Sequence, residues 1–133
     1  MTTAYLALGT NLGNKEQNLS KAIELLNLRA GTVTARSSVH KTEPWGFESV
    51  NDFLNMVVRI ETSLTPLALL RTAKDIEKKM GRAPKSEAGY HDRIIDIDII
   101  LYGDLVYRSD ELTLPHPLYK ERPFVFEPLN EIL

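Results

Sequence analysis

The chain has 133 residues, a formal net charge of −2 and no cysteine. Its length predicts a single domain, residues 1–133, with a hydrophobic core, and its 43% hydrophobic and 26% charged residues are ordinary for a soluble globular protein. The small net charge argues against a general nucleic-acid-binding surface, and the lack of cysteine excludes disulfides, cysteine-based zinc sites and a cysteine nucleophile. No apolar run is long enough to cross a membrane and the N-terminus lacks the layout of a signal peptide, so we expect a cytoplasmic protein.

The N-terminal half alternates strand and helix patterns. Its apolar or β-branched segments predict three strands, at Thr3–Gly9, Thr32–Lys41 and Phe53–Thr62. Between the first two, Asn14 is a suitable N-cap, and Gln17 is in position to complete a capping box. This helix is expected to stop at Gly31 and to bury one stripe, Leu19, Ala22, Ile23 and Leu26. The turn Gly9–Gly13 before the helix weakly suggests phosphate binding, but its glycines are more simply explained by the turn itself.

A second helix is predicted to begin at Thr65-Pro66, where a cap precedes a proline in the first turn, and to end at Gly81. Its apolar stripe runs through Leu70, Ala73, Ile76 and Met80. Glu77 borders this stripe; it is either a helix-edge residue that reaches water or a polar group that faces a site. A polar loop and a further strand follow, which gives the order β-α-β-β-α-β of a ferredoxin-like fold.

The segment from Arg93 to Tyr102 is the most informative part of the chain. Its β-branched residues predict a strand, and its otherwise apolar faces predict an interior one. Alternation gives one face Ile95, Ile97, Ile99 and Leu101, and the other Ile94, Asp96, Asp98, Ile100 and Tyr102. The two carboxylates then point the same way, roughly 7 Å apart. Because paired like charges are costly away from water, a hard cation such as Mg²⁺ is one explanation, and a solvated strand face or a salt-bridge pair is the other.

A few further side chains are candidates for binding. Arg82 and Arg93 flank the polar loop, and guanidinium groups match phosphate oxygens. His116 lies between two prolines and is either structural or rigidly presented to a ligand. Trp45 and Phe47 either cap the core or stack on a planar ligand. No P-loop and no Gly-x-Gly-x-x-Gly motif is present, so ATP would have to bind without them.

A combination of segments spread over nearly the whole chain carries a family resemblance. These segments are Leu8–Gly13, Thr42–Gly46, Phe53–Asn55, Glu77, Gly81-Arg82, Asp92–Gly103, Leu112–His116 and Arg122–Phe124. Each is weak alone, but Arg-x-x-Asp-x-Asp followed by Pro-His is highly specific. Together they resemble the 6-hydroxymethyl-7,8-dihydropterin pyrophosphokinase family of the folate pathway.

The resemblance implies a fold and a reaction. The fold is a single-domain ferredoxin-like α/β (α+β) sandwich with a mostly antiparallel sheet and extra C-terminal elements. The reaction moves pyrophosphate from ATP to the hydroxymethyl group of the pterin and releases AMP. Two Mg²⁺ ions, held by Asp96 and Asp98, would clamp the triphosphate and draw the hydroxyl toward an alkoxide, so no dedicated protein base is required. The implied partners are these small molecules, with no nucleic acid and no membrane, in a monomer or weak homodimer.

The resemblance also implies roles for individual residues. The catalytic group would contain Arg82, Arg93, Asp96 and Asp98. ATP would be bound by Glu77, Arg82, Arg93, Ile99, Thr113, His116 and Arg122. The pterin would be bound by Thr42, Pro44, Trp45, Phe53, Asn55, Asp96 and Phe124.

The chain departs from the family pattern in the polar loop. Tyr90-His91-Asp92 stands where the family usually has Trp-Gly-Pro, and Pro84 stands where a second arginine is common, with Lys85 as a possible substitute charge. Two rival hypotheses are a different Asp-x-Asp metal-dependent transferase and a ferredoxin-like module that binds a small molecule without chemistry. The first would use another donor or yield another product, and the second would not need the aspartates.

Overall fold

The computed structural model describes residues 1–42, 52–81 and 94–133, and these form an α/β sandwich. The elements in chain order are β1 (Thr2–Thr10), α1 (Lys15–Arg29), β2 (Thr32–Arg36), β3 (His40–Thr42), β4 (Phe53–Thr62), α2 (Pro66–Lys79), β5 (Asp96–Tyr102), β6 (Tyr107–Arg108), β7 (Thr113–Leu114), the 3₁₀ helix η1 (Tyr119–Glu121) and α3 (Pro123–Ile132). None of the helices in these ranges is long and apolar enough to cross a membrane.

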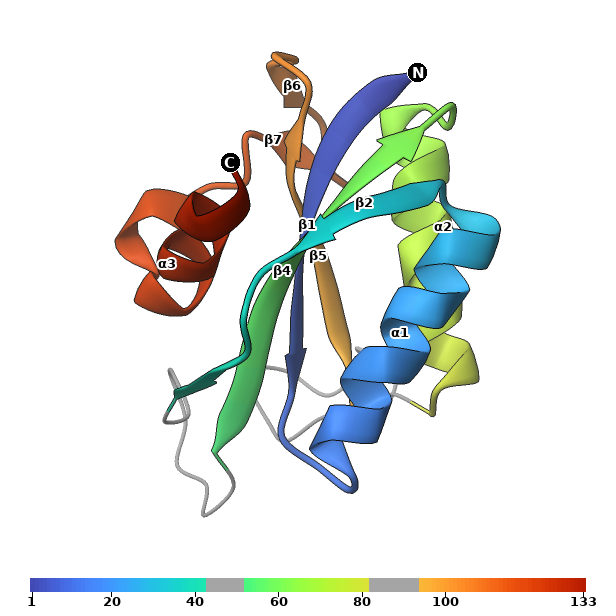
Figure 1. The fold of residues 1–133 in the computed structure, drawn as a ribbon. Helices are drawn as coiled ribbons and strands as arrows, with labels where there is room; N and C mark the ends of the chain where they lie inside the picture. The colour runs from blue at the N-terminus through green and yellow to red at the C-terminus, as the bar shows by residue number, and fades with distance from the viewer. Residues whose placement is uncertain (43–51, 82–93) are drawn as a thin grey trace.

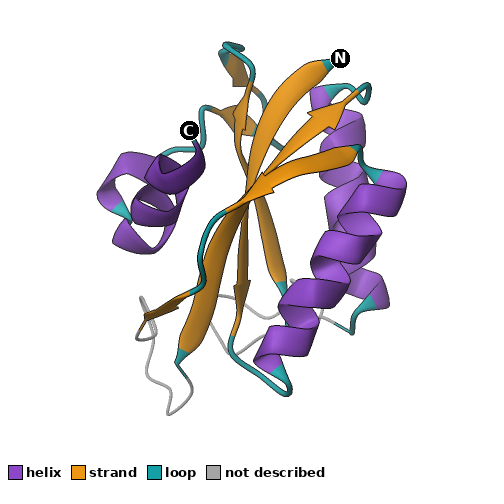
Figure 2. Cartoon of the chain, viewed as in Figure 1, coloured by secondary structure: helices purple, strands orange, loops and turns teal. Residues whose placement is uncertain are grey.

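The main sheet is antiparallel and has the strand order β2-β4-β1-β5, with the short β3 also paired to β4. Helices α1 and α2 cover one face and α3 covers the other (Figures 1 and 2). The larger core lies under α1 and α2, and a smaller one lies under α3, where Val125 and Leu129 pack against Ala7, Val57 and Ile100. The predicted ferredoxin-like order is therefore confirmed, with α3 as the main C-terminal addition.

Side-chain caps start both long helices where the sequence predicts. The Asn14 side chain accepts a hydrogen bond from the Gln17 backbone at 3.1 Å, and Thr65 Oγ1 accepts one from the Ala68 backbone at 3.2 Å. These bonds satisfy amide groups that have no partner within the first turn of a helix. The predicted stripe of α1 is buried in full.

The predicted strand Thr32–Lys41 is wrong in one respect, because it is two strands. Both strands pair with β4. At the end of β2, Arg36 lies opposite Val58, and at the start of β3, His40 lies opposite Asn55. The three residues 37–39 therefore lie opposite only the two residues 56–57 of β4. At this interruption the Ser37 hydroxyl accepts from the Val57 amide at 2.9 Å and donates to the Ser38 carbonyl at 2.8 Å. A serine side chain thus takes the place of a regular ladder bond, and β3 begins as a separate short strand.

The prediction for β5 is correct at Ile95, Ile97 and Ile99, which are buried on the helix side. It is wrong at Leu101 and Tyr102, because the register with β1 shifts between Leu6–Ile99 and Tyr5–Leu101. This bulge moves Leu101 to the α3 face, and Tyr102 to the helix face, where its hydroxyl donates to the Leu64 carbonyl at 2.6 Å.

The predicted interior position of β5 is also wrong. Among the described strands, β5 pairs only with β1 and is an edge of the main sheet. Its apolar residues are explained by the helical layers on both faces rather than by two neighbouring strands. Two groups of its outer edge have other partners, since the Ile97 amide donates to Glu77 and the Ile100 carbonyl accepts from the His116 amide.

Gly31 allows the close approach of the α1–β2 connection to β4. A Cβ at this position would lie 2.3 Å from the Glu61 carbonyl oxygen, which is backbone and cannot move aside cheaply. We expect Gly31→Ala to lower the free energy of unfolding by about 1–3 kcal/mol, measured by urea denaturation. Lys21→Ala, on the exposed side of α1, is the control and should change it by less than about 0.5 kcal/mol. Equal stability of both variants would contradict the close contact.

Candidate functional site

The α3 face of the sheet carries a row of residues that includes the predicted site residues Asp96 and Asn55. Asp96 of β5 lies opposite Gly9 of β1, Gly9 lies opposite Asn55 of β4, and Asn55 lies opposite His40 of β3. Directly opposed residues in neighbouring strands have their side chains on the same face. The register therefore brings residues from four strands together in one line across the sheet.

Gly9, which is buried, lets two other side chains approach the backbone closely in the middle of this row. A Cβ on Gly9 would lie 3.0 Å from Asn55 Oδ1 and 3.7 Å from Cδ1 of the Phe53 ring. The lack of a side chain on Gly9 therefore allows a polar amide and an aromatic ring to lie side by side next to its backbone. This shape and chemistry suit a flat heterocycle.

The Asn55 amide is oriented by β3. Its Nδ2 donates to Thr42 Oγ1 at 2.6 Å, so its Oδ1 is directed toward Gly9. The amide is buried, with 7% of its surface exposed. A fixed acceptor at this position can receive an N–H of a ligand that lies over Gly9.

Asp96 and Asp98 are both half-buried and share the α3 face, as predicted. Their partners across the ladder are the small residues Gly9 and Ala7, which leave room above the carboxylates. Mg²⁺ is typically held by one or two carboxylates plus water and substrate phosphates. The described ranges contain no group of three or more His, Cys, Asp or Glu residues suited to a metal, and Mg²⁺ does not require one. The donor set therefore fits Mg²⁺ bound together with a phosphate-bearing substrate.

His116 lies within electrostatic reach of two other predicted site residues. The net effect of the surroundings is to lower the pKa of its imidazole below the usual 6.5, and burial is the largest cause. The positive charge of Arg122 also lowers this pKa. The hydrogen bond to Pro117 and the negative charge of Asp96 act in the opposite direction. Nδ1 is 2.7 Å from the Pro117 carbonyl oxygen, which can only accept, so Nδ1 carries the proton of the neutral ring. Nε2 is then an acceptor until the ring is protonated, which a nearby phosphate would favour.

Glu77 does not reach water, so the helix-edge alternative is wrong. It is 6% exposed, and its Oε2 accepts from the Ile97 amide at 2.7 Å. The Glu77 carboxylate thus reaches the outer edge of β5 from the helix layer. It binds the backbone of Ile97, the residue between Asp96 and Asp98. Its contact with ATP stays a prediction.

The other predicted residues lie in different parts of the structure. Ile99 is buried in the core under α1 and α2, Thr113 is half-buried in β7, Arg122 directly precedes α3, and Phe124 packs at the edge of the smaller core. Five predicted residues lie outside the described ranges, namely Pro44, Trp45, Phe47, Arg82 and Arg93.

Comparison with known proteins decides the family. The model of the 7,8-dihydro-6-hydroxymethylpterin-pyrophosphokinase (HPPK) family matches residues 5–133. The chain belongs to this family. The predicted resemblance is therefore confirmed.

Relatives of similar length support the HPPK assignment. The chain is 46% identical to the 2-amino-4-hydroxy-6-hydroxymethyldihydropteridine pyrophosphokinase of Porphyromonas gingivalis over 136 residues, covering 99% of this chain and 91% of that protein. It is 43% identical to the protein of the same name from Bacillus subtilis, covering 97% of this chain and 77% of that protein.

Solved structures agree on the fold. A crystal structure of an HPPK-DHPS in complex with substrates matches with a TM-score of 0.78 at 17% identity. A Plasmodium falciparum HPPK-DHPS triple mutant matches with a TM-score of 0.79, also at 17% identity. The chain is covered to 98% in both but spans only 40% and 39% of those longer proteins.

The role of Gly9 was missed in the sequence. Gly9 was predicted as the last residue of a strand and the first of a turn, but β1 continues to Thr10, and of Gly9 and Gly13 only Gly13, with a φ of +70°, has the backbone of a turn glycine. The signal that could have found it is its place as the one glycine in an apolar strand, where close approach of another group is a common reason.

Removal of the Glu77 carboxylate should destabilise the edge of β5. We expect Glu77→Ala to lower the free energy of unfolding by about 1–3 kcal/mol, because the buried Ile97 amide loses its acceptor. Glu77→Gln keeps an acceptor oxygen and should lose less. Urea denaturation of the two variants checks this, and equal losses would show that the hydrogen bond is not what stabilises the edge.

The charges around His116 can be tested by NMR titration of its imidazole in the metal-free protein. We expect the imidazole of His116 to titrate with a midpoint below pH 6.5. The midpoint should fall further in Asp96→Asn, which removes a negative charge, and rise in Arg122→Gln, which removes a positive one. The imidazole of His116 takes up its proton less readily in the folded protein than in the unfolded chain. Its contribution to the free energy of unfolding is therefore fully present above pH 6.5 and is lost as the pH falls below that value.

Asp75→Asn is the control for this titration, because Asp75 lies on α2 and pairs with Arg29 on the helix side. Its removal should leave the His116 midpoint unchanged. A midpoint that does not respond to Asp96→Asn would contradict the proximity of His116 to the carboxylates.

Proposed function

We propose that this HPPK-family chain transfers the pyrophosphoryl group of ATP to the hydroxymethyl oxygen of 6-hydroxymethyl-7,8-dihydropterin and releases AMP, a step of folate biosynthesis. The observation that carries the proposal is the row Asp96–Gly9–Asn55, which places a carboxylate pair and an oriented amide on the same face of the sheet, on either side of one glycine. The pterin would lie over Gly9, with its hydroxymethyl group toward the carboxylates.

The pterin end of the site acts by orientation. Asn55 Oδ1 would accept from the N–H groups of the heterocycle, and the bond from Nδ2 to Thr42 holds the amide in place beside Gly9. Phe53, beside Gly9, would hold one part of the ring by apolar contact. Phe124, at the start of α3, would supply a further aromatic face. Fixing the hydroxymethyl oxygen in line with phosphorus lowers the entropic part of the barrier.

The residues at the end of the site that would receive the ATP phosphates act through their charges. Asp96 and Asp98 would hold Mg²⁺, two ions by family resemblance, and bound Mg²⁺ neutralises phosphate charge and makes the alcohol a better nucleophile. In the reaction a bond forms between the hydroxymethyl oxygen and the β-phosphorus, the bond from that phosphorus to the α–β bridging oxygen breaks, and the hydroxyl proton is released. Arg122 would attract phosphate, and His116 would donate from Nε2 once protonated.

Further parts of the proposal rest on the resemblance alone. Arg82 and Arg93 would bind the phosphates of ATP, and Pro44 and Trp45 would close the pterin pocket; Glu77, Ile99 and Thr113 would contact ATP. The cytoplasmic location and the monomeric or weakly dimeric state stay predictions. The two rival functions lack the support that family membership gives to the pyrophosphokinase.

The test is release of AMP from ATP in the presence of Mg²⁺ and 6-hydroxymethyl-7,8-dihydropterin. We expect AMP only when all three are present, and at least about a 100-fold lower rate for Asp96→Ala, because a metal-binding carboxylate is lost. Asp104→Ala is the matched control, since Asp104 is exposed just beyond β5, and should retain the parent rate.

Each rival predicts another outcome of this assay. ADP as the product would indicate an ordinary kinase. Pterin binding without turnover, equal in the parent and in Asp96→Ala, would indicate a binding module.

A further inference from the structure

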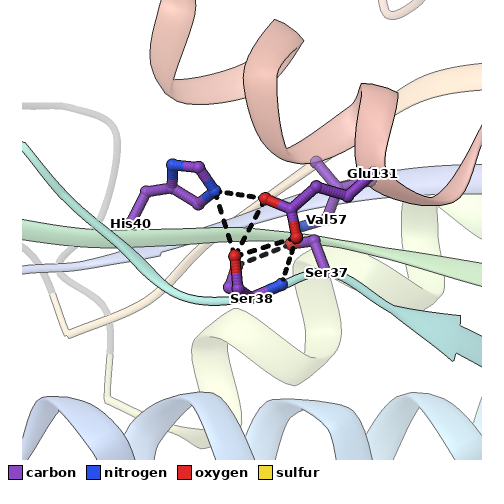
Figure 3. Close-up of polar contacts among 5 residues, drawn as sticks. All are labelled: Ser37, Ser38, His40, Val57 and Glu131. Atoms are coloured by element: carbon purple, nitrogen blue, oxygen red, sulfur yellow. Dashed lines mark hydrogen bonds and ion pairs between the residues drawn. The ribbon is translucent and has the colours of Figure 1, made fainter.

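Glu131, near the end of α3, makes a dense set of contacts with the segment between β2 and β3 (Figure 3). Its Oε1 accepts from the Ser38 backbone amide and from Ser38 Oγ, both at 2.8 Å. Its Oε2 lies 2.5 Å from His40 Nε2 and 2.9 Å from Ser38 Oγ. One carboxylate thereby connects α3 to residues 91 and 93 positions earlier in the chain.

This cluster is not a catalytic serine triad. In such a triad the acid binds one imidazole nitrogen and the serine binds the other. Here Glu131 and the Ser38 hydroxyl, 3.3 Å away, both approach Nε2 of His40. The Ser38 hydroxyl donates to the carboxylate and is not activated by the ring. The geometry is that of an anchor.

The carboxylate is ionised under ordinary conditions. The bond from the Ser38 amide, followed by the contact with His40, lowers the pKa of Glu131 to about 2. A single exposed ion pair contributes little to stability, but here a backbone amide, a hydroxyl and an imidazole share one acceptor.

Strand β3 needs such an anchor because it is short and separate. It contains only His40–Thr42, and residues 37–39 interrupt its continuity with β2. In the described ranges its one strand partner is β4, with His40 opposite Asn55 and Thr42 opposite Phe53. Any displacement of β3 therefore moves the Thr42 hydroxyl relative to the Asn55 amide.

Helix α3 spans the distance between this cluster and the other side of the pterin pocket. Phe124 and Glu131 are seven residues apart, about two helical turns, and so lie on the same side of α3. Between them, Val125 and Leu129 are buried against the sheet. The buried middle of α3 thus holds both ends at fixed positions on the sheet.

We propose that Glu131, through Ser38 and His40, is a positioning residue for the pterin pocket, which holds β3 so that Thr42 keeps the Asn55 amide in its binding orientation. The proposal rests on the proposed function for its substrate. Glu131 does not touch the reacting atoms, and it acts on binding of the pterin, not on the phosphates.

The experiment compares Glu131→Ala and Glu131→Gln with the parent in the AMP-release assay. We expect Glu131→Ala to raise KM for the pterin roughly three- to tenfold and to leave KM for ATP and kcat nearly unchanged. Glu131→Gln keeps an acceptor for Ser38 and should fall between the parent and the alanine variant.

Asp75→Ala is the matched control, because it breaks an ion pair of α2 with Arg29 at 2.6 Å on the opposite face of the sheet. Glu127→Ala is a second control, since it removes an exposed carboxylate from the same helix one turn before Glu131. Neither should change KM for the pterin.

Amide hydrogen exchange provides a readout that does not depend on activity. We expect faster exchange at residues 40–42 in Glu131→Ala than in either control. An unchanged KM for the pterin, or unchanged exchange at residues 40–42, would overturn the positioning role. Absence of AMP release from the parent would overturn the proposed function instead, and the exchange data would still decide whether Glu131 holds β3.

Discussion

The pairing of β1 with β4 on one side and with β5 on the other is the constraint on which the site depends. These two ladders set Gly9 between Asn55 and Asp96. Because side chains alternate along a strand, a slip of one residue would turn both aspartates toward the helices and Ile97 toward α3. Two carboxylates in the core under α1 and α2 would be costly, so the isoleucines that surround them enforce the register that exposes them to a ligand.

The outer edge of β5 has a double role in this structure. An exposed edge is a hazard because its amide and carbonyl groups can pair with another chain. Here the Glu77 carboxylate accepts a hydrogen bond from the Ile97 amide, and the His116 backbone amide donates one to the Ile100 carbonyl. Two residues assigned to nucleotide binding by resemblance therefore also complete the hydrogen bonding of the strand that holds the aspartates. The same two contacts place Glu77 and His116 beside the strand that carries the aspartates.

Local signals in the sequence were sufficient for the elements and for the carboxylate pair. Asn14 and Thr65 predicted the helix starts, and the alternation around Asp96 and Asp98 predicted their common face. The break at Ser37 was not visible, because it depends on whether a serine hydroxyl or the backbone supplies the bond to β4. Likewise, the contact of Glu131 with His40 depends on how α3 docks, which no neighbouring residue specifies.

The bulge in β5 divides one strand into two independently packed parts. On the site side of it, Ile95, Ile97 and Ile99 face the helices; beyond it, Tyr102 faces them instead, and Ile100 and Leu101 both belong to the α3 side. A bulge absorbs local rearrangement because its extra residue has no opposite partner. The far end of the strand can therefore pack Tyr102 against the helix layer, although the two aspartates keep the opposite face. Without the shift in register, alternation would place Tyr102 on the face of the aspartates, away from the Leu64 carbonyl that its hydroxyl contacts just before α2.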